Sequence, residues 1–336
     1  MSITPQITEE QAKHIQPMIV DAVYGTNVML NFFKQNNLIE PIPKGLLSYE
    51  YFDWKEMETG KMGSGIQDLP VVHPVLGKTT LQIVYFGLKV EIGFRVVDNW
   101  RNSINPRIGT NKDILTEALR QAVKPMNRTI SSFLAYGDDN IYLRDDDPLR
   151  GQGKFFGMFN QGQIFAAGAG GDDIMHAFND YQATSAKATG LLEENEFRKK
   201  TYLIMSDKNT HEDAQAGNAA VHINPNGKSE RDIQLERKDI AGWAYSSRWY
   251  PYSAGYPTTK ESRILYTTPT TPEGNKAYRL LQGYNFDIVR ANGGNVNDNF
   301  KYVVGIFWCG VFDPIIKDSN DKCKAILVSG ALDFDG

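Results

Sequence analysis

The chain has 336 residues, of which 41% are hydrophobic and 23% charged, a composition typical of a globular protein with a large buried core and not of a disordered chain or a coiled coil. Forty acidic against 36 basic residues give a formal net charge of -4. The chain therefore lacks the excess of basic residues that sequence-specific binding to nucleic acid would require. At roughly 150 residues per domain, the length allows two domains or one elaborate domain.

The sequence carries no sign of export or of membrane insertion. Residues Met1 to Glu10 lack the basic region and apolar stretch of a signal peptide, so we expect the protein to start in a cytosol. The longest apolar run, Tyr302 to Phe312, has 11 residues, whereas a spanning helix needs roughly 20. We interpret this run as a buried strand. Cys309 and Cys323 are too few for a disulfide framework or a cysteine-based zinc site, and we expect both thiols to be reduced.

Residues 1–45 are expected to form a mixed N-terminal arm. Its apolar residues follow a helical period: Ile15, Met18, Ile19, Ala22 and Val23. Since proline fits best in the first turn of a helix, Pro17 predicts that the helix begins near that residue, and Pro41-Ile42-Pro43 ends the helical segment.

Residues 46–95 are expected to form a long β-hairpin, because Leu46 to Trp54 and Thr79 to Phe94 are rich in aromatic and β-branched residues. The glycine-rich stretch Thr59 to Gly65 would be its tip. An isolated two-stranded ribbon is unstable in water, so the hairpin packs either on its own domain or on a neighbouring subunit. The candidate subunit-interface residues are Tyr49, Tyr51, Trp54, Lys61, Met62, Ile66, Leu81, Ile83, Tyr85 and Phe86.

The clearest helix is predicted over residues 111–136, after a Thr110-Asn111 cap and before Gly137. About 24 residues make a rod of roughly 36 Å, and we expect Pro125 to bend it. The residues expected to face the core are Leu115, Leu119, Ala122, Met126, Ile130 and Phe133.

The second half of the chain gives weaker patterns. We predict a helix from Asp172 to Ala188, a strand from Thr201 to Met205, a Thr/Pro linker from Thr267 to Pro272 and a short helix from Glu273 to Leu281.

The chain is expected to close with a hairpin of two strands, Val303 to Ile316 and Lys324 to Val328. The turn at residues 318–321 would place Cys323 opposite a residue near Ile316 and away from Cys309.

A search for catalytic, cofactor or metal sites gives no prediction of one. His211-Glu212-Asp213 with His222 is the nearest approach to a metal cluster, but its side chains diverge and a solvated surface is favoured. The acidic turns, such as Asp145 to Asp147, fit caps and turns better than calcium ligands. The aromatic stretch from Trp243 to Tyr256 could form a stacking platform for sugars or bases, but a packed turn region or a subunit contact is favoured.

The order of these elements resembles the Hong Kong 97 phage-type capsid fold, which major capsid proteins of tailed viruses share with encapsulins. The resemblance covers about residues 45 to 336. It depends on the helix Leu115 to Gly137, on Ser132 to Asp139 followed by Lys154 to Asn160, and on Tyr202 to Met205.

The resemblance implies an α+β protein with five parts. These are the N-terminal arm (1–45), an extended β-hairpin loop (46–95), a peripheral domain with a spine helix (96–169, helix 111–136), an apical domain (170–290) and closing strands that return to the peripheral domain (291–336).

The resemblance also implies the function of a bacteriophage major capsid protein, a structural protein and not an enzyme, without cofactor. It would assemble in the host cytoplasm, as pentamers and hexamers of itself, into an icosahedral virion capsid around double-stranded DNA bound without sequence specificity. Portal, scaffolding or decoration proteins would be further partners, and no membrane would be involved. An encapsulin-like nanocompartment shell is the alternative, followed by a carbohydrate-active or calcium-binding protein.

Overall fold

The computed structural model describes residues 9–54, 76–93, 113–137, 145–151, 155–165, 201–205, 240–245, 264–270, 274–290, 301–317 and 322–329. The chain divides into two compact units of three segments each. The first unit contains Met1–Leu46, Ile83–Leu134 and Leu280–Val311, and the second contains Leu47–Gln82, Ala135–Arg279 and Phe312–Gly336.

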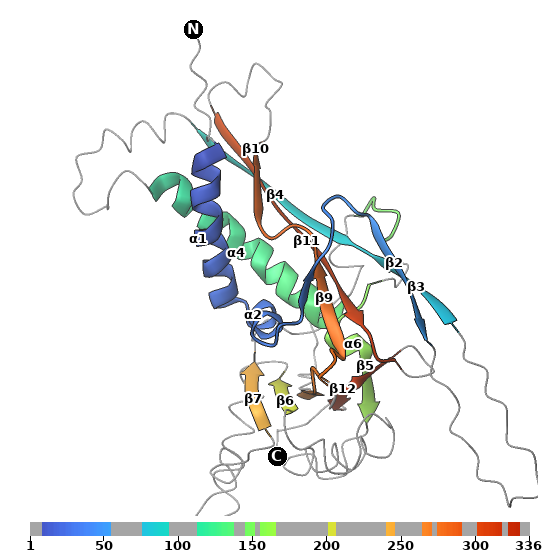
Figure 1. Cartoon of the computed structure of the whole chain (residues 1–336). Coiled ribbons are helices and arrows are strands. Elements are labelled where there is room, and N and C mark those ends of the chain that lie inside the picture. The colour runs from blue at the N-terminus through green and yellow to red at the C-terminus, as the bar shows by residue number, and fades with distance from the viewer. Residues whose placement is uncertain are drawn as a thin grey trace, which may run out of the picture. The chain divides into compact units, whose positions relative to one another are not determined.

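A mixed sheet and three helices form the first unit. The helices are α1 (Glu9–Thr26), α2 (Val28–Gln35) and α4 (Asp113–Tyr136), and the strands are β1 (Ile39–Pro41), β4 (Val84–Gly93), β9 (Tyr278–Gln282), β10 (Asp287–Arg290) and β11 (Lys301–Pro314). The strand order is β1-β9-β11-β10, and β4 also pairs with β11. β11 is antiparallel to both β4 and β10, and β1 is parallel to β9 (Figure 1).

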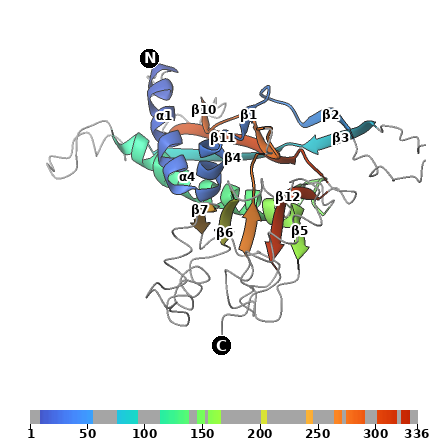
Figure 2. The ribbon, with the colours of Figure 1, turned by 60° about the horizontal axis from the view of Figure 1, so that its bottom comes forward.

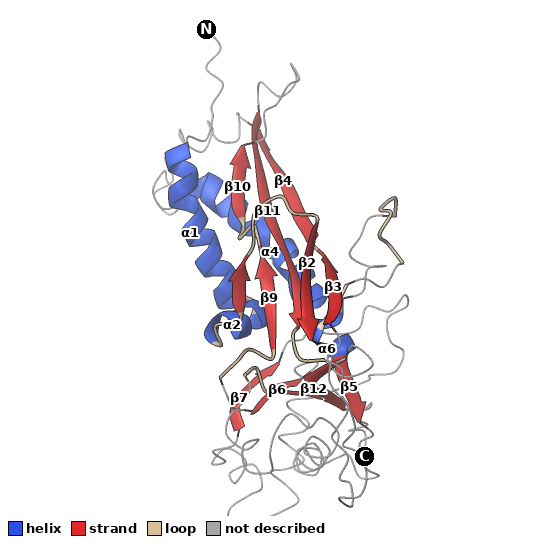
Figure 3. Ribbon diagram, turned by 45° about the vertical axis from the view of Figure 1, so that its right-hand side comes forward, coloured by secondary structure: helices blue, strands red, loops and turns tan. Residues whose placement is uncertain are grey.

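The helix α4 confirms the spine helix predicted from the sequence. Leu119, Ile130 and Phe133 are at most 1% exposed, and Met126 is also buried. Ala122 is half-buried, while the cap at residues 110–111 and the side chain of Leu115 lie outside the described part. Phe133 meets Phe86 of β4 edge to face at 5.4 Å between ring centroids, so α4 packs against one face of the sheet. Figure 3 shows the helices on that face.

The N-terminal arm contains two helices, and the predicted start at Pro17 is wrong. Pro17 lies inside α1, which already runs from Glu9. Pro17 lies on the exposed side of α1, where a proline is tolerated better than against the core because water can replace the lost backbone hydrogen bond. Asn27 then caps α2, its side chain accepting a hydrogen bond from the Leu30 amide at 3.0 Å.

The junction of α1 and α2 is joined to α4 by a buried amide pair. Asn27 Nδ2 donates to Asn127 Oδ1 of α4, and Asn127 Nδ2 donates to Thr26 Oγ1 at 3.0 Å. Because both asparagines are buried, a shift of one helix along the other would leave these groups without partners.

A five-stranded sheet and a hairpin form the second unit. The sheet has the order β5-β12-β8-β6-β7 (Figure 2). Its strands are β5 (Gly162–Phe165), β6 (Thr201–Met205), β7 (Ile240–Tyr245), β8 (Ile264–Thr267) and β12 (Cys323–Ser329), and a short helix, α6 (Met158–Gln161), precedes β5. β6 confirms the strand predicted at Thr201. The hairpin pairs β2 (Ser48–Trp54) antiparallel with β3 (Leu76–Gln82).

Two predictions of secondary structure are wrong, because strand pairing with distant parts of the sequence decides the structure of these segments. Thr79 to Phe94 is not one strand: β3 ends at Gln82 and pairs with β2, whereas β4 begins at Val84 and pairs with β11. The segment Glu273 to Leu281 is not a helix, since residues from Tyr278 form β9 between β1 and β11. Pairing on both sides outweighs the helical propensity of the segment.

The closing strands are present, but they do not form the predicted hairpin. β11 pairs with β4 and β10, and β12 pairs with β5 and β8. Only an isolated bridge between Lys317 and Cys323 joins their ends, which confirms the expected position of Cys323 opposite a residue near Ile316. Both cysteines are buried and free.

The end of α4 requires glycine. Gly137 has φ of +63°, and a Cβ there would lie 2.6 Å from the Gly157 amide nitrogen and 2.9 Å from the Phe155 carbonyl oxygen. The two short motifs quoted for the family resemblance, around Gly137 and around Gly157, are therefore in direct backbone contact.

Candidate functional site

The β2–β3 hairpin has two chemically different faces, which we call the inner and outer faces. Directly paired residues share a face, and the pairs Tyr49↔Leu81, Tyr51↔Thr79 and Asp53↔Gly77 form the inner one. The pairs Glu50↔Thr80, Phe52↔Lys78 and Trp54↔Leu76 belong to the outer face. The described inner side chains are buried or half-buried and those of the outer pairs are exposed, so the strand alternation predicts the burial pattern.

The inner face is held by a buried carboxylate. Asp313, near the end of β11, is 0% exposed. Tyr51 donates its hydroxyl to Asp313 Oδ1 at 2.7 Å, and Arg279 Nε donates to Oδ2 at 2.8 Å. Both oxygens of the buried carboxylate therefore have a partner, which offsets the cost of its desolvation.

Two cations also lie over the rings of the inner face. The Arg279 guanidinium is 5.3 Å from the centroid of the Tyr51 ring and 5.9 Å from that of Tyr49. Lys317 Nζ lies 5.9 Å from the Tyr51 centroid and donates to Thr79 Oγ1 at 3.2 Å. We call Tyr51, Arg279, Asp313 and Lys317 the hairpin anchor.

Tyr51 stays neutral in the hairpin anchor. Burial and, next, the negative charge of Asp313 raise the pKa of its hydroxyl far above the ordinary value, because an ionised phenolate would be poorly solvated and would face a carboxylate. The neutral hydroxyl is the form that can donate to Asp313. The anchor therefore works as a positioning device.

The outer face exposes large apolar side chains beside an ion pair. Phe52 is 68% exposed and Leu76 is 51% exposed, and the register makes them diagonal neighbours. Lys78 Nζ lies 2.8 Å from Glu50 Oε2, and this contact lowers the pKa of the Glu50 carboxyl. Exposed apolar residues at neighbouring positions of a hairpin favour a contact surface over a solvated one.

The ten candidate interface residues from the sequence are distributed over very different environments. Leu81, Ile83 and Phe86 are buried within the chain itself, which leaves them little surface for a contact with another subunit. Phe86, for example, contacts the Trp308 ring of its own unit at 5.7 Å between ring centroids. Tyr49 and Tyr51 are half-buried in the anchor, and Tyr85 is 37% exposed.

The remaining candidates are not tested. Lys61, Met62 and Ile66 lie outside the described residues, and so does the side chain of Trp54. Two exposed apolar residues of the hairpin, Phe52 and Leu76, are not among these ten candidates. Their position diagonal to one another follows only from the strand register.

Sequence reasoning also missed the anchor residues contributed by the distant chain. Asp313 follows an apolar run and precedes Pro314, and a carboxylate at the end of a buried strand is a signal for a required partner. Arg279 was hidden by the incorrect helix prediction.

An aromatic cluster lies in the first unit around Tyr85. The Tyr284 ring is 6.2 Å from the Tyr85 ring and 6.4 Å from that of Phe307, centroid to centroid. Lys44 forms an ion pair with Asp287, and its ammonium lies 5.3 Å from the Tyr284 centroid. This contact with Asp287 raises the pKa of Lys44.

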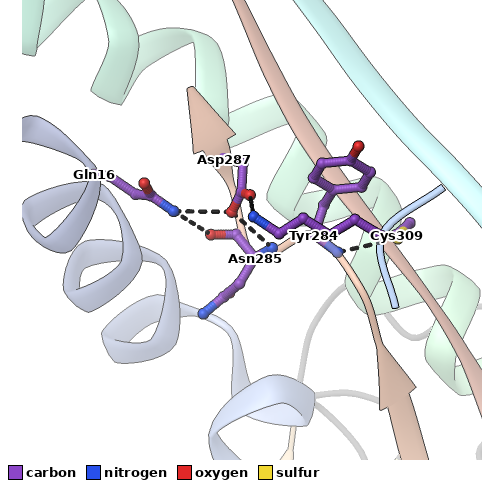
Figure 4. Close-up of polar contacts among 6 residues, drawn as sticks. Gln16, Tyr284, Asn285, Asp287 and Cys309 are labelled. Atoms are coloured by element: carbon purple, nitrogen blue, oxygen red, sulfur yellow. Dashed lines mark hydrogen bonds and ion pairs between the residues drawn. The ribbon is translucent and has the colours of Figure 1, made fainter. Parts of the chain in front are cut away.

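The turn between β9 and β10 joins this cluster to α1. Gln16 Nε2 of α1 donates to Asp287 Oδ1 at 2.9 Å, and the Asn285 amide donates to the same oxygen at 3.2 Å (Figure 4). The Tyr284 amide donates to Cys309 Sγ at 3.1 Å. These contacts order the turn between β9 and β10.

The candidate chemistry sites of the sequence have little structural counterpart in the described part of the chain. Asp147 accepts a hydrogen bond from the Leu149 amide at 2.9 Å, which confirms a turn role. The His211 cluster lies outside the described residues, as do the aromatic side chains from Trp243 onward. Among the described residues, no group of three His, Cys, Asp or Glu side chains is placed to hold a metal ion. No described helix is long and apolar enough to cross a bilayer.

Comparison with known proteins gives matches by structure alone. No protein-family model and no curated protein matches the sequence. The capsid of Myoviridae phage XM1 superposes with a TM-score of 0.54 at 14% identity, covering 89% of this chain and 91% of that chain. The capsid of an empty gene transfer agent particle gives 0.52 at 13% identity, over 90% of each chain. A virus-like particle from Pyrococcus furiosus gives 0.50 at 12% identity, over 96% of this chain and 100% of that chain.

The chain has the Hong Kong 97-type capsid fold. The resemblance inferred from the order of elements is therefore confirmed. Identities of 12 to 14% show the Hong Kong 97-type fold and carry no information on individual residues.

Proposed function

We propose that the chain is a major capsid protein, of which many copies assemble into a closed icosahedral shell around double-stranded DNA. The observation that carries the proposal is the extent of the structural likeness. It covers about nine tenths of this chain and of the capsid chains of phage XM1 and the gene transfer agent. A likeness of whole chain to whole chain supports a shared role better than a shared module would.

The β2–β3 hairpin supports the proposal physically. Its inner face is fixed by the hairpin anchor, and its outer face presents Phe52 and Leu76 to solvent. A subunit that buries this outer face on a neighbour removes apolar surface from water. Many such contacts in rings of five and six subunits act together, so each can be weak.

The five-part division belongs to this proposal, with one change. β4 is assigned to the peripheral domain, because it pairs with β11 along ten residue pairs and has no pairing with β2. The extended loop would then end at Gln82. Within this account the protein has a structural role in the virion and assembles in the host cytoplasm, and Tyr85 and Trp54 remain interface candidates.

An encapsulin-like nanocompartment is the second candidate. The likeness to the virus-like particle from Pyrococcus furiosus, which covers that whole chain, favours it specifically. The two candidates differ in contents: a capsid encloses nucleic acid and a nanocompartment encloses protein.

Electron microscopy and sedimentation velocity of the purified full chain test the proposal. We expect closed shells of uniform diameter that sediment far faster than a single subunit. A protein that stays a monomer at high concentration and shows no particles would contradict both candidates. The absorbance ratio at 260 and 280 nm and gel analysis of the particles from the native source then separate nucleic acid from a protein cargo.

A further inference from the structure

The turn between β9 and β10 holds a bulky residue in a strained backbone conformation. Among the described residues other than glycine, Asn37 and Phe286 have a positive φ, of 56° and 54°. Asn37 follows the C-cap of α2, where the left-handed conformation is common and asparagine is tolerated. Phe286 is 0% exposed and has a large side chain, for which this conformation is unfavourable. Other contacts must therefore offset the strain of the turn.

Two side chains of α1, which we call the α1 catch, supply hydrogen bonds to this turn. Gln16 Nε2 donates to the Asn285 carbonyl oxygen at 3.5 Å as well as to Asp287 Oδ1 at 2.9 Å (Figure 4). The Tyr24 hydroxyl lies 3.3 Å from Gln282 Oε1 and 3.4 Å from Asn285 Oδ1, and these two acceptors share its single hydrogen. The contacts at 3.3 Å or more are longer than usual hydrogen bonds, so each stabilises the turn only weakly.

The helix α1 has a weak point beside the catch. Pro17 lies inside α1 and has no amide hydrogen, so the helix lacks one backbone hydrogen bond next to Gln16. Helices bend most readily at such positions. A bend at Pro17 changes the position of Gln16 relative to Tyr24, which lies about two turns later in the helix. The strained turn therefore meets α1 where the backbone of the helix has lost a hydrogen bond.

The same turn positions a ring on the other face of the sheet. Phe86 faces α4, so its neighbour Tyr85 lies on the opposite face by strand alternation. Tyr284 belongs to the turn, and its ring packs there against the rings of Tyr85 and Phe307. The Tyr284 carbonyl accepts a hydrogen bond from the Cys309 amide at 3.1 Å, which joins the turn to β11. The turn therefore contacts α1 through one set of residues and the aromatic cluster through another.

We infer that this turn is a conformational relay: the α1 catch holds Phe286 in its strained conformation and thereby holds Tyr284 in the aromatic cluster. Release of the catch lets Phe286 leave the left-handed region, and Tyr284 then loses its fixed position against Tyr85 and Phe307. A change at α1 is in this way passed to the opposite face of the sheet, and a change at the aromatic cluster is passed back to α1. The relay belongs to the single subunit and does not rest on the proposed shell function.

Hydrogen exchange of the purified full chain, followed by mass spectrometry, tests the relay. The catch variant is Gln16→Ala, Tyr24→Phe, and the matched control is Met18→Ala, Asp21→Ala, whose side chains are exposed on the same helix. We expect the amides of residues 283–287 to exchange about five-fold faster in the catch variant, because the turn loses weak hydrogen bonds that oppose its strain. Amides of α2 and α4 should keep their rates, and the control should match wild type. Unchanged exchange of the turn in the catch variant overturns the inference.

Two substitutions at residue 286 separate strain from ordinary packing. Phe286→Gly and Phe286→Ala both remove the ring, but only glycine adopts a positive φ without strain. Adding the catch substitutions should therefore speed exchange of the turn about five-fold in the alanine background and less than about two-fold in the glycine background. Equal increases in the two backgrounds would show a contact that only packs, and would overturn the inference.

A stabilising variant keeps the test decisive where the others fail to fold. Pro17→Ala restores a backbone hydrogen bond of α1 and strengthens the helix beside Gln16. We expect the amides of residues 283–287 to exchange more slowly in this variant than in wild type. An unchanged or faster rate contradicts the link between α1 and the turn.

Nitration by tetranitromethane, mapped by mass spectrometry, measures the far end of the relay. In the catch variant Tyr284 should react faster relative to Tyr49, a half-buried ring of the β2–β3 hairpin that serves as internal reference. The control variant should keep the wild-type ratio. A ratio that stays constant in the catch variant while the turn exchanges faster would show that the turn opens without moving the ring, and would overturn the relay to the opposite face.

Discussion

The sheet of the first unit and the β2–β3 hairpin of the second are stabilised in opposite ways. In the sheet, Phe86, Trp308 and Phe133 pack ring against ring with almost no exposed surface. In the hairpin, a buried carboxylate, two cations and a tyrosine hydroxyl fix one face, while the other face leaves Phe52 and Leu76 in solvent. Apolar packing is not directional and contributes mainly to the stability of the fold, whereas hydrogen bonds and ion pairs are directional and fix one orientation of the hairpin.

The sheet and the hairpin differ in this way although they are adjacent in the sequence. β3 and β4 are separated by a single residue, Ile83, yet they pair with different strands in different sheets. A strand pair that must present an apolar face outward cannot be held by burying that face. The polar hairpin anchor supplies the alternative, and it leaves the outer face available for another subunit.

The largest loss of stability is expected from a substitution among the buried rings between α4 and the sheet of the first unit. Phe133→Ala removes a ring that is 1% exposed and leaves a cavity, so the free energy of unfolding should fall by about 3–5 kcal/mol. Urea unfolding followed by circular dichroism measures it. Phe307→Ala, at a ring that is 37% exposed, is the control and should cost less than half as much. Equal losses of unfolding free energy in the two variants would contradict the claim that the buried rings between α4 and the sheet contribute most of the stability.

A slightly smaller effect is expected from breaking the hairpin anchor. Arg279→Met leaves the carboxylate of Asp313 buried without its ionic partner, which should cost about 3 kcal/mol in the same unfolding assay. Arg150→Met is the matched control, because its partner Asp145 is 95% exposed and such pairs contribute about 0–1 kcal/mol. A cost for Arg279→Met no larger than that of the control would contradict the anchoring role.

Removing the Tyr51 hydroxyl is expected to cost about 1–2 kcal/mol at neutral pH, because Asp313 loses one charge-assisted hydrogen bond. The pKa of Tyr51 is raised above its ordinary value of 10.0, so the neutral form is favoured in the folded chain. Its contribution is therefore complete below pH 10 and decreases as the pH rises above that value. Unfolding curves of wild type and Tyr51→Phe at several alkaline pH values should converge. A difference that grows with pH would refute this.

Much of the fold could be predicted from local patterns, and the errors in the strands share one cause. The period of α4, the aromatic and β-branched residues of β2 and the apolar run of β11 are strong local signals, and each element forms in the segment predicted for it. Pairing partners are not local. Nothing in residues 303–328 indicates that β12 is inserted between β5 and β8 and does not pair along β11.

The candidate site was predictable only in part. Aromatic density located the hairpin, but it did not distinguish the inner face from the outer face. Leu81 and Phe52 have similar hydrophobicity, yet they lie at 0% and 68% exposure because the register assigns them to opposite faces. The anchor depends on Arg279 and Asp313, which are more than 190 residues from Trp54 in sequence, and no pattern within the hairpin points to them.

The smallest effect on the subunit should accompany the largest effect on assembly. Phe52→Ser with Leu76→Ser changes only exposed side chains, so subunit stability should stay within about 0.5 kcal/mol of wild type. Sedimentation velocity of this double variant tests the central claim most directly, with Glu50→Ser, Lys78→Ser on the same face as the control. We expect the apolar variant to remain as slowly sedimenting subunits or small rings while the control forms shells. Shells of normal size and yield from the apolar variant would contradict the claim that the outer face of the β2–β3 hairpin joins subunits.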